Sequence, residues 1–105
     1  MLNNPEDQKL VTLAQATLKR SGADQAAALR DVTGRTYVAV AIDSPSLKLD
    51  AVEAVFTVAM ASQIDGIEAV VFTGERSAKT SVISDFAPMA AIFFANDGAV
   101  PDKIA

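Results

Sequence analysis

The chain has 105 residues, half of them hydrophobic and 21% charged, which suits one globular domain with one core. The formal net charge of −4 and the scattered basic residues argue against nucleic acid or an anionic membrane as the main partner. The sequence contains no Cys and no His, which excludes disulfides, thiolate nucleophiles, Ser-His-Asp triads and the ligands that zinc prefers. Acid–base chemistry would therefore fall to Asp, Glu, Lys or the single tyrosine, Tyr37.

The hydrophobic residues occur in short runs. No run reaches the roughly 18 residues that a membrane span needs. The beginning, MLNNPEDQK, is polar and acidic, unlike a secretory signal. A cytoplasmic location is therefore expected.

The first predicted element is a helix over residues 5–20. Asn4 is a suitable N-cap, and Pro5 fits the first helical position. Gly22 can end the helix. One apolar stripe runs along it: Leu10, Val11, Ala14 and Leu18.

Two strands with a hairpin turn between them are expected next. The Ala-rich segment 25–30 could continue as helix by propensity, but the turn signal at 31–34 favours a strand. Residues 36–42 are β-branched and apolar on both faces, which predicts a central strand. Residues 43–46 contain Pro and two Ser, which predicts a loop.

The central part of the chain predicts a buried helix followed by a buried strand. Between Ala51 and Ala61 the only polar residues are Glu53 and Thr57, so this helix is expected to be buried on more than one side. Gly66 is a stop signal. The continuous apolar run at 69–72 is typical of a strand covered on both faces.

The C-terminal third is expected to contain a loop, a helix and a short tail. The polar segment 74–81 predicts an exposed loop. A last helix would be capped by Ser84 or Asp85, take its apolar face from 90–95 and end at Asn96-Asp97-Gly98. The tail AVPDKIA has room for one short strand. The order of elements predicts an α/β fold, a three-layer α/β/α sandwich with a mixed sheet, in one domain over residues 1–105.

The order and the local motifs together resemble the cytidine deaminase family. Residues 25–42 match the first hairpin of that family without a gap, including the Gly-basic-x-Tyr pattern at 34–37. Residues 43–49 resemble the loop before the active-site helix. Residues 51–53, Ala-Val-Glu, fall where the family has Cys-Ala-Glu or His-Ala-Glu, and 85–88 fall where it has Cys-x-x-Cys. The resemblance implies a cytidine deaminase-like fold that is shortened at its C-terminus.

In that family three Cys or His residues hold a zinc ion between two helix N-termini, and a glutamate transfers protons. Carried over to this sequence, the ligand positions are Ala51, Asp85 and Pro88, and the glutamate position is Glu53. Alanine and proline have no side-chain donor, so the resemblance predicts no zinc and no other cofactor. The sequence therefore argues against the deaminase reaction.

The substrate-binding positions implied by the resemblance have also changed. The base-stacking Phe falls at Ala23, and the ribose-binding Asn falls at Ala41. The ribose-binding Glu is replaced by Asp43. Asp43 and Glu53 are thus the candidate ligand-binding residues.

The candidate acidic residues have structural alternatives. Glu53 with Asp50 fits a capping box, and we favour this over a general base. Asp50, Glu53 and Asp85 could form a weak Mg²⁺ or Ca²⁺ site, although two capped helix ends explain them without a cation. Asp43 is more typical of an Asx-turn before Pro45 than of a ribose contact.

Two further groups of residues also have structural alternatives. Arg76 and Lys79 could bind a phosphate, but a solvated loop is the favoured interpretation. Five large side chains could line an apolar pocket, but core packing is favoured for them. These are Phe56, Met60, Phe86, Phe93 and Phe94.

The predicted function is that of a catalytically inactive deaminase-like protein with an interaction or structural role. A homo-oligomer is expected, and another protein is a further possible partner. Val55, Val58 and Ala61 would lie on the outer side of the central helix, and the strand at 69–72 would risk an open edge. Members of the resembled family also associate through this region. Binding of a nucleoside or nucleobase in a degenerate pocket is the alternative, and Mg²⁺-assisted hydrolysis is a weaker third one.

Overall fold

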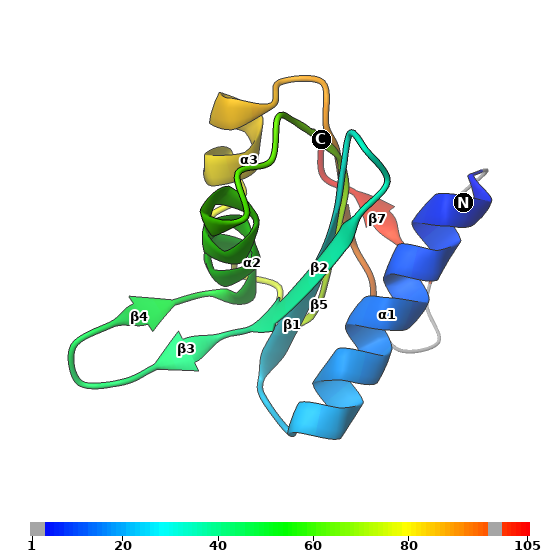
Figure 1. Ribbon diagram of the computed structural model, residues 1–105. Coiled ribbons are helices and arrows are strands. Elements are labelled where there is room, and N and C mark those ends of the chain that lie inside the picture. The colour runs from blue at the N-terminus through cyan, green and yellow to red at the C-terminus, as the bar shows by residue number, and fades with distance from the viewer. Residues whose placement is uncertain (1–3, 97–99) are drawn as a thin grey trace.

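The computed structural model describes residues 4–96 and 100–105 (Figure 1). A five-stranded mixed sheet in the order β2-β1-β5-β6-β7 forms the middle layer. Helix α1 covers one face, and α2 and α3 cover the other. The predicted α/β sandwich with a mixed sheet is confirmed.

Helix α1 (Pro5–Ser21) forms where the sequence predicts it. The Asn4 side chain accepts a hydrogen bond from the N–H of Glu6 at 2.9 Å, and Gly22 ends the helix in a left-handed conformation at φ 69°. The buried stripe packs on one face of the sheet, with Leu10, Val11 and Ala14 as its innermost residues.

Strands β1 (Gln25–Asp31) and β2 (Thr36–Val40) form the predicted antiparallel hairpin. The Asp31 carboxylate organises the turn, because one of its oxygens accepts from the main-chain N–H groups of Thr33 and Arg35, both at 2.9 Å. The strand interpretation of the Ala-rich segment is therefore correct.

The prediction that β2 is a central strand is wrong. Among the residues that the structure describes, β2 is an edge strand that pairs only with β1, and its residues are exposed or half-buried. The seven residues of β1 are all buried, because β1 lies between β2 and β5 (Ile67–Gly74) and has α layers on both faces. The small side chains of its Ala run let the helices approach closely. β-branched composition reports on packing against neighbours and does not set a strand's place in the sheet.

The chain after β2 forms a projecting hairpin in place of the predicted continuation of the strand. β3 (Ile42–Asp43) pairs with β4 (Lys48–Leu49) in a separate two-stranded ladder, and Figure 1 shows this arm (residues 42–49) extending away from the body. Ser44 closes the loop of the arm, since its side-chain oxygen accepts the N–H of Leu47 at 3.1 Å.

Helix α2 (Ala51–Ala61) and strand β5 confirm the predicted helix and strand in the centre of the chain. Gln63, at φ 60°, makes the turn between them. Val55 is fully buried against the sheet, so its expected place on the outer side is wrong. Val58, at 43% exposure, and Ala61 do lie on the outside.

The last predicted helix is wrong in its position. The structure has a short helix α3 (Ser81–Phe86), which ends before Pro88, and then a strand, β6 (Ala91–Phe94). A short apolar run fits a buried strand as well as a helix, and here the β5 edge provides the pairing partner. Asp97 and Gly98, which were expected to end that helix, lie outside the described residues.

The C-terminal tail adds the last strand to the β6 side of the sheet. β6 runs parallel to β5, and β7 (Asp102–Lys103) pairs antiparallel with β6. The tail therefore forms the one short strand for which the sequence leaves room. The expectation of an open edge at the third strand is wrong, because β5 is paired on both sides.

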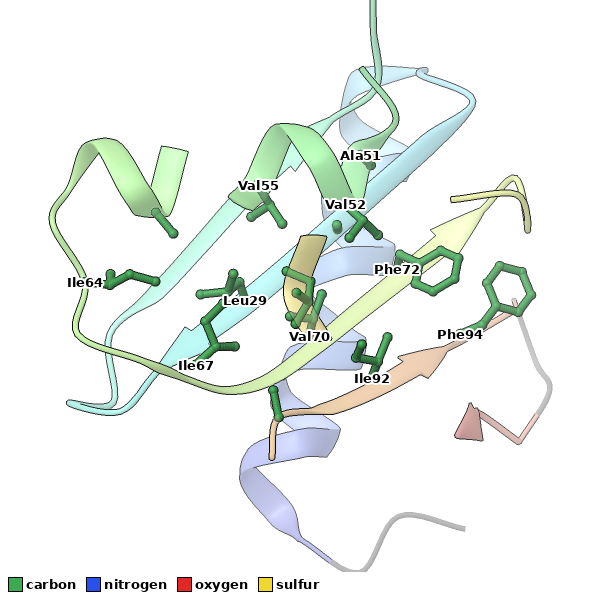
Figure 2. Packing of buried hydrophobic residues seen from close by; sticks show 14 residues of the cluster. Leu29, Ala51, Val52, Val55, Ile64, Ile67, Val70, Phe72, Ile92 and Phe94 are labelled. Carbon is green, nitrogen blue, oxygen red and sulfur yellow. The ribbon is translucent and has the colours of Figure 1, made fainter. Parts of the chain in front are cut away.

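The larger core lies between the sheet and the two helices α2 and α3. Figure 2 shows Leu29, Val70 and Ile92 on three neighbouring strands, with Val52 and Val55 of α2 above them. Across the described residues, no helix is long and apolar enough to cross a membrane.

Candidate functional site

The beginning of α2 is where the resemblance to deaminases places a metal and a catalytic glutamate. Here Asp50 is the N-cap, and its Oδ1 accepts the N–H of Glu53 at 2.8 Å. The Glu53 Oε1 accepts the N–H of Asp50 at 3.0 Å. The predicted capping box is confirmed, and it accounts for an oxygen of each carboxylate.

Gln25, at the beginning of β1, completes this network. Its Oε1 accepts the N–H of Ala51 at 2.7 Å, and its Nε2 donates to the carbonyl oxygens of Glu75 and Ser77 at 2.6 and 3.0 Å. The side chain is fully buried. Gln25 is not among the candidate residues predicted from the sequence. The available signal was a polar amide at the head of an otherwise apolar Ala run.

The loop after β5 lies against the beginning of α2. The N–H of Lys79 donates to Asp50 Oδ2 at 2.7 Å, and the N–H of Glu75 donates to the carbonyl oxygen of Asp24 at 2.9 Å. Gly74 permits this course, since its φ is +95° and a Cβ there would lie 2.3 Å from the Asp24 oxygen. The segment that faces α2 is therefore residues 75–79.

Asp85 and Pro88 lie at the C-terminal end of α3. Asp85 is in the last turn of α3, and Pro88 follows the end of that helix. Neither residue caps a helix N-terminus, so the expected cap at Asp85 is wrong. The acidic cluster of Asp50, Glu53 and Asp85 does not form. Within residues 4–96 and 100–105 no three acidic side chains gather in a way that could hold a metal ion.

Asp43 lies in the exposed arm. Its carboxylate is 3.5 Å from Lys48 Nζ, and both side chains are largely in solvent. Its expected Asx-turn is wrong, because Ser44 makes the loop contacts. Among the described residues, Asp43 interacts with Lys48 of the arm, whereas Glu53 belongs to the capping box of α2.

Arg76 has partners within the chain. Its Nη1 donates to Asp102 Oδ2 at 2.9 Å, and its guanidinium carbon lies 4.8 Å from the centre of the Phe94 ring. These contacts attach the loop to β7 and β6. Lys79 donates a hydrogen bond from its main-chain N–H to Asp50. This contact is not part of the phosphate hypothesis, which concerned its side chain.

The large apolar side chains divide between the core and the surface. Phe93 and Phe94 are buried on opposite faces of β6, which confirms core packing for both. Phe56 and Phe86 pack edge to face at 5.8 Å between α2 and α3, and both keep some exposure. Met60 lies on the outer side of α2. These five residues do not line one pocket.

The residues at this site do not fit a zinc ion. Ala51 is fully buried with a methyl side chain, and its N–H is already bonded to Gln25. The facing loop turns main-chain groups toward α2, and its side chains include the cations Arg76 and Lys79. Zinc sites need thiolate, imidazole or several carboxylate donors converging on one point.

The architecture defines an α/β sandwich of the cytidine deaminase type. The cytidine deaminase from Burkholderia pseudomallei superposes with a TM-score of 0.73 at 16% identity, over 100% of this chain and 93% of that one. The cytidine deaminase from Bacillus anthracis gives 0.69 at 17% identity, over 96% and 84%. At these identities the likeness shows the fold alone.

The family is shown by sequence. The family model described as cytidine deaminase-like matches residues 3–99, and the chain belongs to this family. No curated protein matches the sequence.

Proposed function

We propose that this chain is a catalytically inactive cytidine deaminase-like protein with an interaction or structural role, assembled from copies of itself. The observation that carries the proposal is the closed network at the beginning of α2. Asp50 and Glu53 cap each other, and the Ala51 N–H is taken by Gln25. The groups that would face a substrate in a deaminase are here engaged in holding the fold together.

The donor set argues against the deaminase reaction. That reaction uses a metal-bound water whose pKa the metal lowers. The chain has no Cys and no His, and Ala51 has no donor atom. Glu53 alone cannot generate hydroxide near neutral pH.

Metal analysis and a deamination assay test the proposal together. The purified protein should contain no stoichiometric zinc and should not convert cytidine to uridine, with or without added zinc. An active enzyme that is inhibited by a zinc chelator would overturn the assignment.

Nucleoside binding without chemistry is the alternative, and the structure supports it less. Asp43 lies in the solvent-exposed arm, and Ala23 and Ala41 lack the groups that the resemblance implies. A thermal-shift screen with cytidine, uridine and cytosine separates the two. A ligand at 100 times its Kd that binds only the folded state adds about 2.7 kcal/mol. We expect no shift, and a saturable one would favour the alternative.

The location and the partners of the protein belong to the same proposal. A cytoplasmic homo-oligomer is proposed, without a nucleic-acid or membrane partner, and the acidic net charge of −4 supports the last part.

A further inference from the structure

Strand β2 leaves one edge of the sheet open (Figure 1). Soluble proteins usually keep such edges short or charged, or interrupt them with a proline or a bulge. The opposite edge follows this rule, because β7 consists only of Asp102 and Lys103. β2 has none of these features, since its five residues are Thr-Tyr-Val-Ala-Val and pair with β1 in an unbroken register. An edge without this protection points to a strand that pairs with it.

The hydrogen bonds of the β1–β2 hairpin show which main-chain groups of β2 are unused. The N–H of Asp31 donates to the carbonyl oxygen of Arg35 at 2.9 Å. The N–H of Ala41 donates to the carbonyl oxygen of Gln25 at 3.0 Å. Because hydrogen-bonded pairs alternate along an antiparallel ladder, the odd-numbered residues from 35 to 41 bond to β1. The N–H and C=O groups that point away from β1 therefore belong to Thr36, Val38 and Val40.

A second copy of β2 provides a partner for all of these groups. If two copies run antiparallel about a two-fold axis at Val38, each Val38 lies opposite the other, and Thr36 lies opposite Val40. Every outward N–H and C=O of the three residues is then paired, because all three fall on hydrogen-bonded positions. The contact is isologous, so it closes after two copies. The two five-stranded sheets would become one continuous sheet.

Opposite charges extend the match beyond the paired strands. In this register Arg35 lies opposite Ala41 of the second copy and diagonal to its Asp43, within reach of a long side chain. Arg35 takes part in no ion pair within the described residues, and Asp43 is largely in solvent. The arm begins directly after Ala41 and exposes Ile42, so its apolar surface is continuous with the edge. Complementary groups therefore meet at both ends of the strand pair.

Helix α2 presents an apolar side at the same edge. It lies about equally over β1 and β2, and Phe56 packs on Phe86 of α3, the gold helix in front of β5 in Figure 2. Val58 is two positions, or about 200°, further round α2, so it faces away from α3 and toward the open edge. Val58 is 43% exposed, and the small Ala54 and Ala61 share its side. With paired strands about 4.8 Å apart, the two α2 helices would come to roughly the 8–10 Å at which helices pack.

We propose that the outer edge of β2 is the surface through which two copies of this chain join, by antiparallel pairing about Val38. The assignment of this edge depends on the self-assembly proposed above, for which it supplies the contact surface. An extended segment of another protein is the competing occupant. The charges at the strand ends and the apolar side of α2 favour a second copy, since a single added strand would cover neither.

Amide hydrogen exchange of the isotope-labelled full chain, followed by NMR on protein whose mass is known from light scattering, tests the pairing. The N–H groups of Tyr37 and Ala39 bond to β1 and should be protected. In the assembled protein those of Thr36, Val38 and Val40 should be protected equally well, whereas an open edge leaves them to exchange like loop amides. Assembled protein with fast exchange at these three groups would overturn the edge pairing and leave self-assembly standing. A parent chain that stays monomeric would overturn both.

A pair of single-cysteine variants locates the two-fold axis. The parent chain has no Cys, so an introduced thiol reports without background. In the paired strands the two Val38 Cα atoms lie about 5.5 Å apart, within disulfide range, whereas the two Thr36 Cα atoms lie roughly 14 Å apart. Oxidation with diamide should therefore link Val38→Cys into a covalent dimer. Thr36→Cys, at a more exposed position of the same edge, should stay unlinked.

Three outcomes would contradict the pairing of two copies. Equal cross-linking of the two variants would exclude an axis at Val38. So would the absence of a covalent dimer in Val38→Cys when this variant assembles like the parent protein. Protection of the outward N–H groups that appears only after a capped hexapeptide of alternating Thr and Val is added would assign the edge to a strand of another protein.

Discussion

Glu53 stands at the position of a catalytic glutamate, yet its carboxylate accepts the N–H of its own N-cap. The role of a residue follows from what surrounds it. Beside a metal-bound water this group would transfer protons, whereas beside Asp50 at a helix beginning it satisfies a main-chain donor. Asp50 carries more of the network, because its second oxygen also holds Lys79 in the facing loop.

Substitutions at these two positions should therefore differ in effect. Asp50→Ala removes the acceptor of two N–H groups and should lower the free energy of unfolding by about 0.5–2 kcal/mol. Glu53→Gln should be milder, since a Gln at this position also completes a capping box. Urea unfolding of both variants measures this. If Glu53→Gln abolished a ligand response at unchanged stability, the capping account of Glu53 would be incorrect.

We expect the carboxylate of Asp31 to make the free energy of unfolding depend on pH. Burial raises the pKa of Asp31, but the hydrogen bonds from Thr33 and Arg35 outweigh this and lower the pKa below its ordinary value of 3.8. In acid the unfolded chain therefore takes up the proton first, and the folded state loses this contribution as the pH falls below 3.8 toward the lowered pKa. Above pH 5 the contribution is fully present.

Asp31→Asn is the matched variant, because it keeps an acceptor oxygen without the charge. The difference in the free energy of unfolding between the parent protein and Asp31→Asn should be largest at neutral pH. It should shrink as the pH falls from 5 toward the lowered pKa of Asp31. Denaturant unfolding across this range is the measurement. A difference that stays constant with pH would show that the charge of Asp31 does not matter.

At the scale of elements, the loop between β5 and α3 has the strictest local requirement. Gly74 combines a φ of +95° with close approach to the Asp24 carbonyl oxygen, whereas Gly22 has a φ of +69° with open space around it. Both positions disfavour a side chain through the backbone, but only Gly74 adds a clash with main-chain atoms that cannot move freely.

Gly22→Ala should cost roughly 1–2 kcal/mol from the left-handed backbone alone. Gly74→Ala should cost clearly more, because the loop must also shift away from β1 and from the beginning of α2. Thermal unfolding of both variants compares the two costs. Equal losses would mean that the loop relaxes without affecting its contacts.

At the scale of the whole molecule, the arm stands apart because its two strands pair only with each other. A two-stranded hairpin alone is marginal in water, and this one exposes Ile42 and Leu47. Val58 and Met60 expose further apolar surface on α2. Packing against a second copy would bury this surface, and a stable interface needs more than about 1,000 Å² in total.

Size-exclusion chromatography with light scattering should therefore report a mass of at least twice the 11.0 kDa of one chain. Changing Ile42 and Leu47 together to Lys should lower the mass toward the monomer. Val32→Lys is the control, since Val32 is 50% exposed at the opposite hairpin turn. A parent protein that runs as a stable monomer at micromolar concentration would contradict the assembly.

The sequence alone determined the features that depend on neighbours a few residues away. The Asn4 cap, the end of α1 at Gly22 and the Asp50–Glu53 box all follow from contacts within one helical turn. The α2–β5 unit followed from its long apolar pattern. The absence of Cys and His, together with the resemblance, was enough to question the deaminase reaction.

Only the tertiary structure decided the features that depend on distant pairing. The segment Ala91–Phe94 is a strand because the β5 edge accepts it, and β2 lies at the edge because β5 takes the other side of β1. Gln25 reaches α2 and the loop at 75–79 across 26 to 52 positions of sequence. Such contacts arise when the sheet assembles, and no local pattern of residues records which strand will lie beside which.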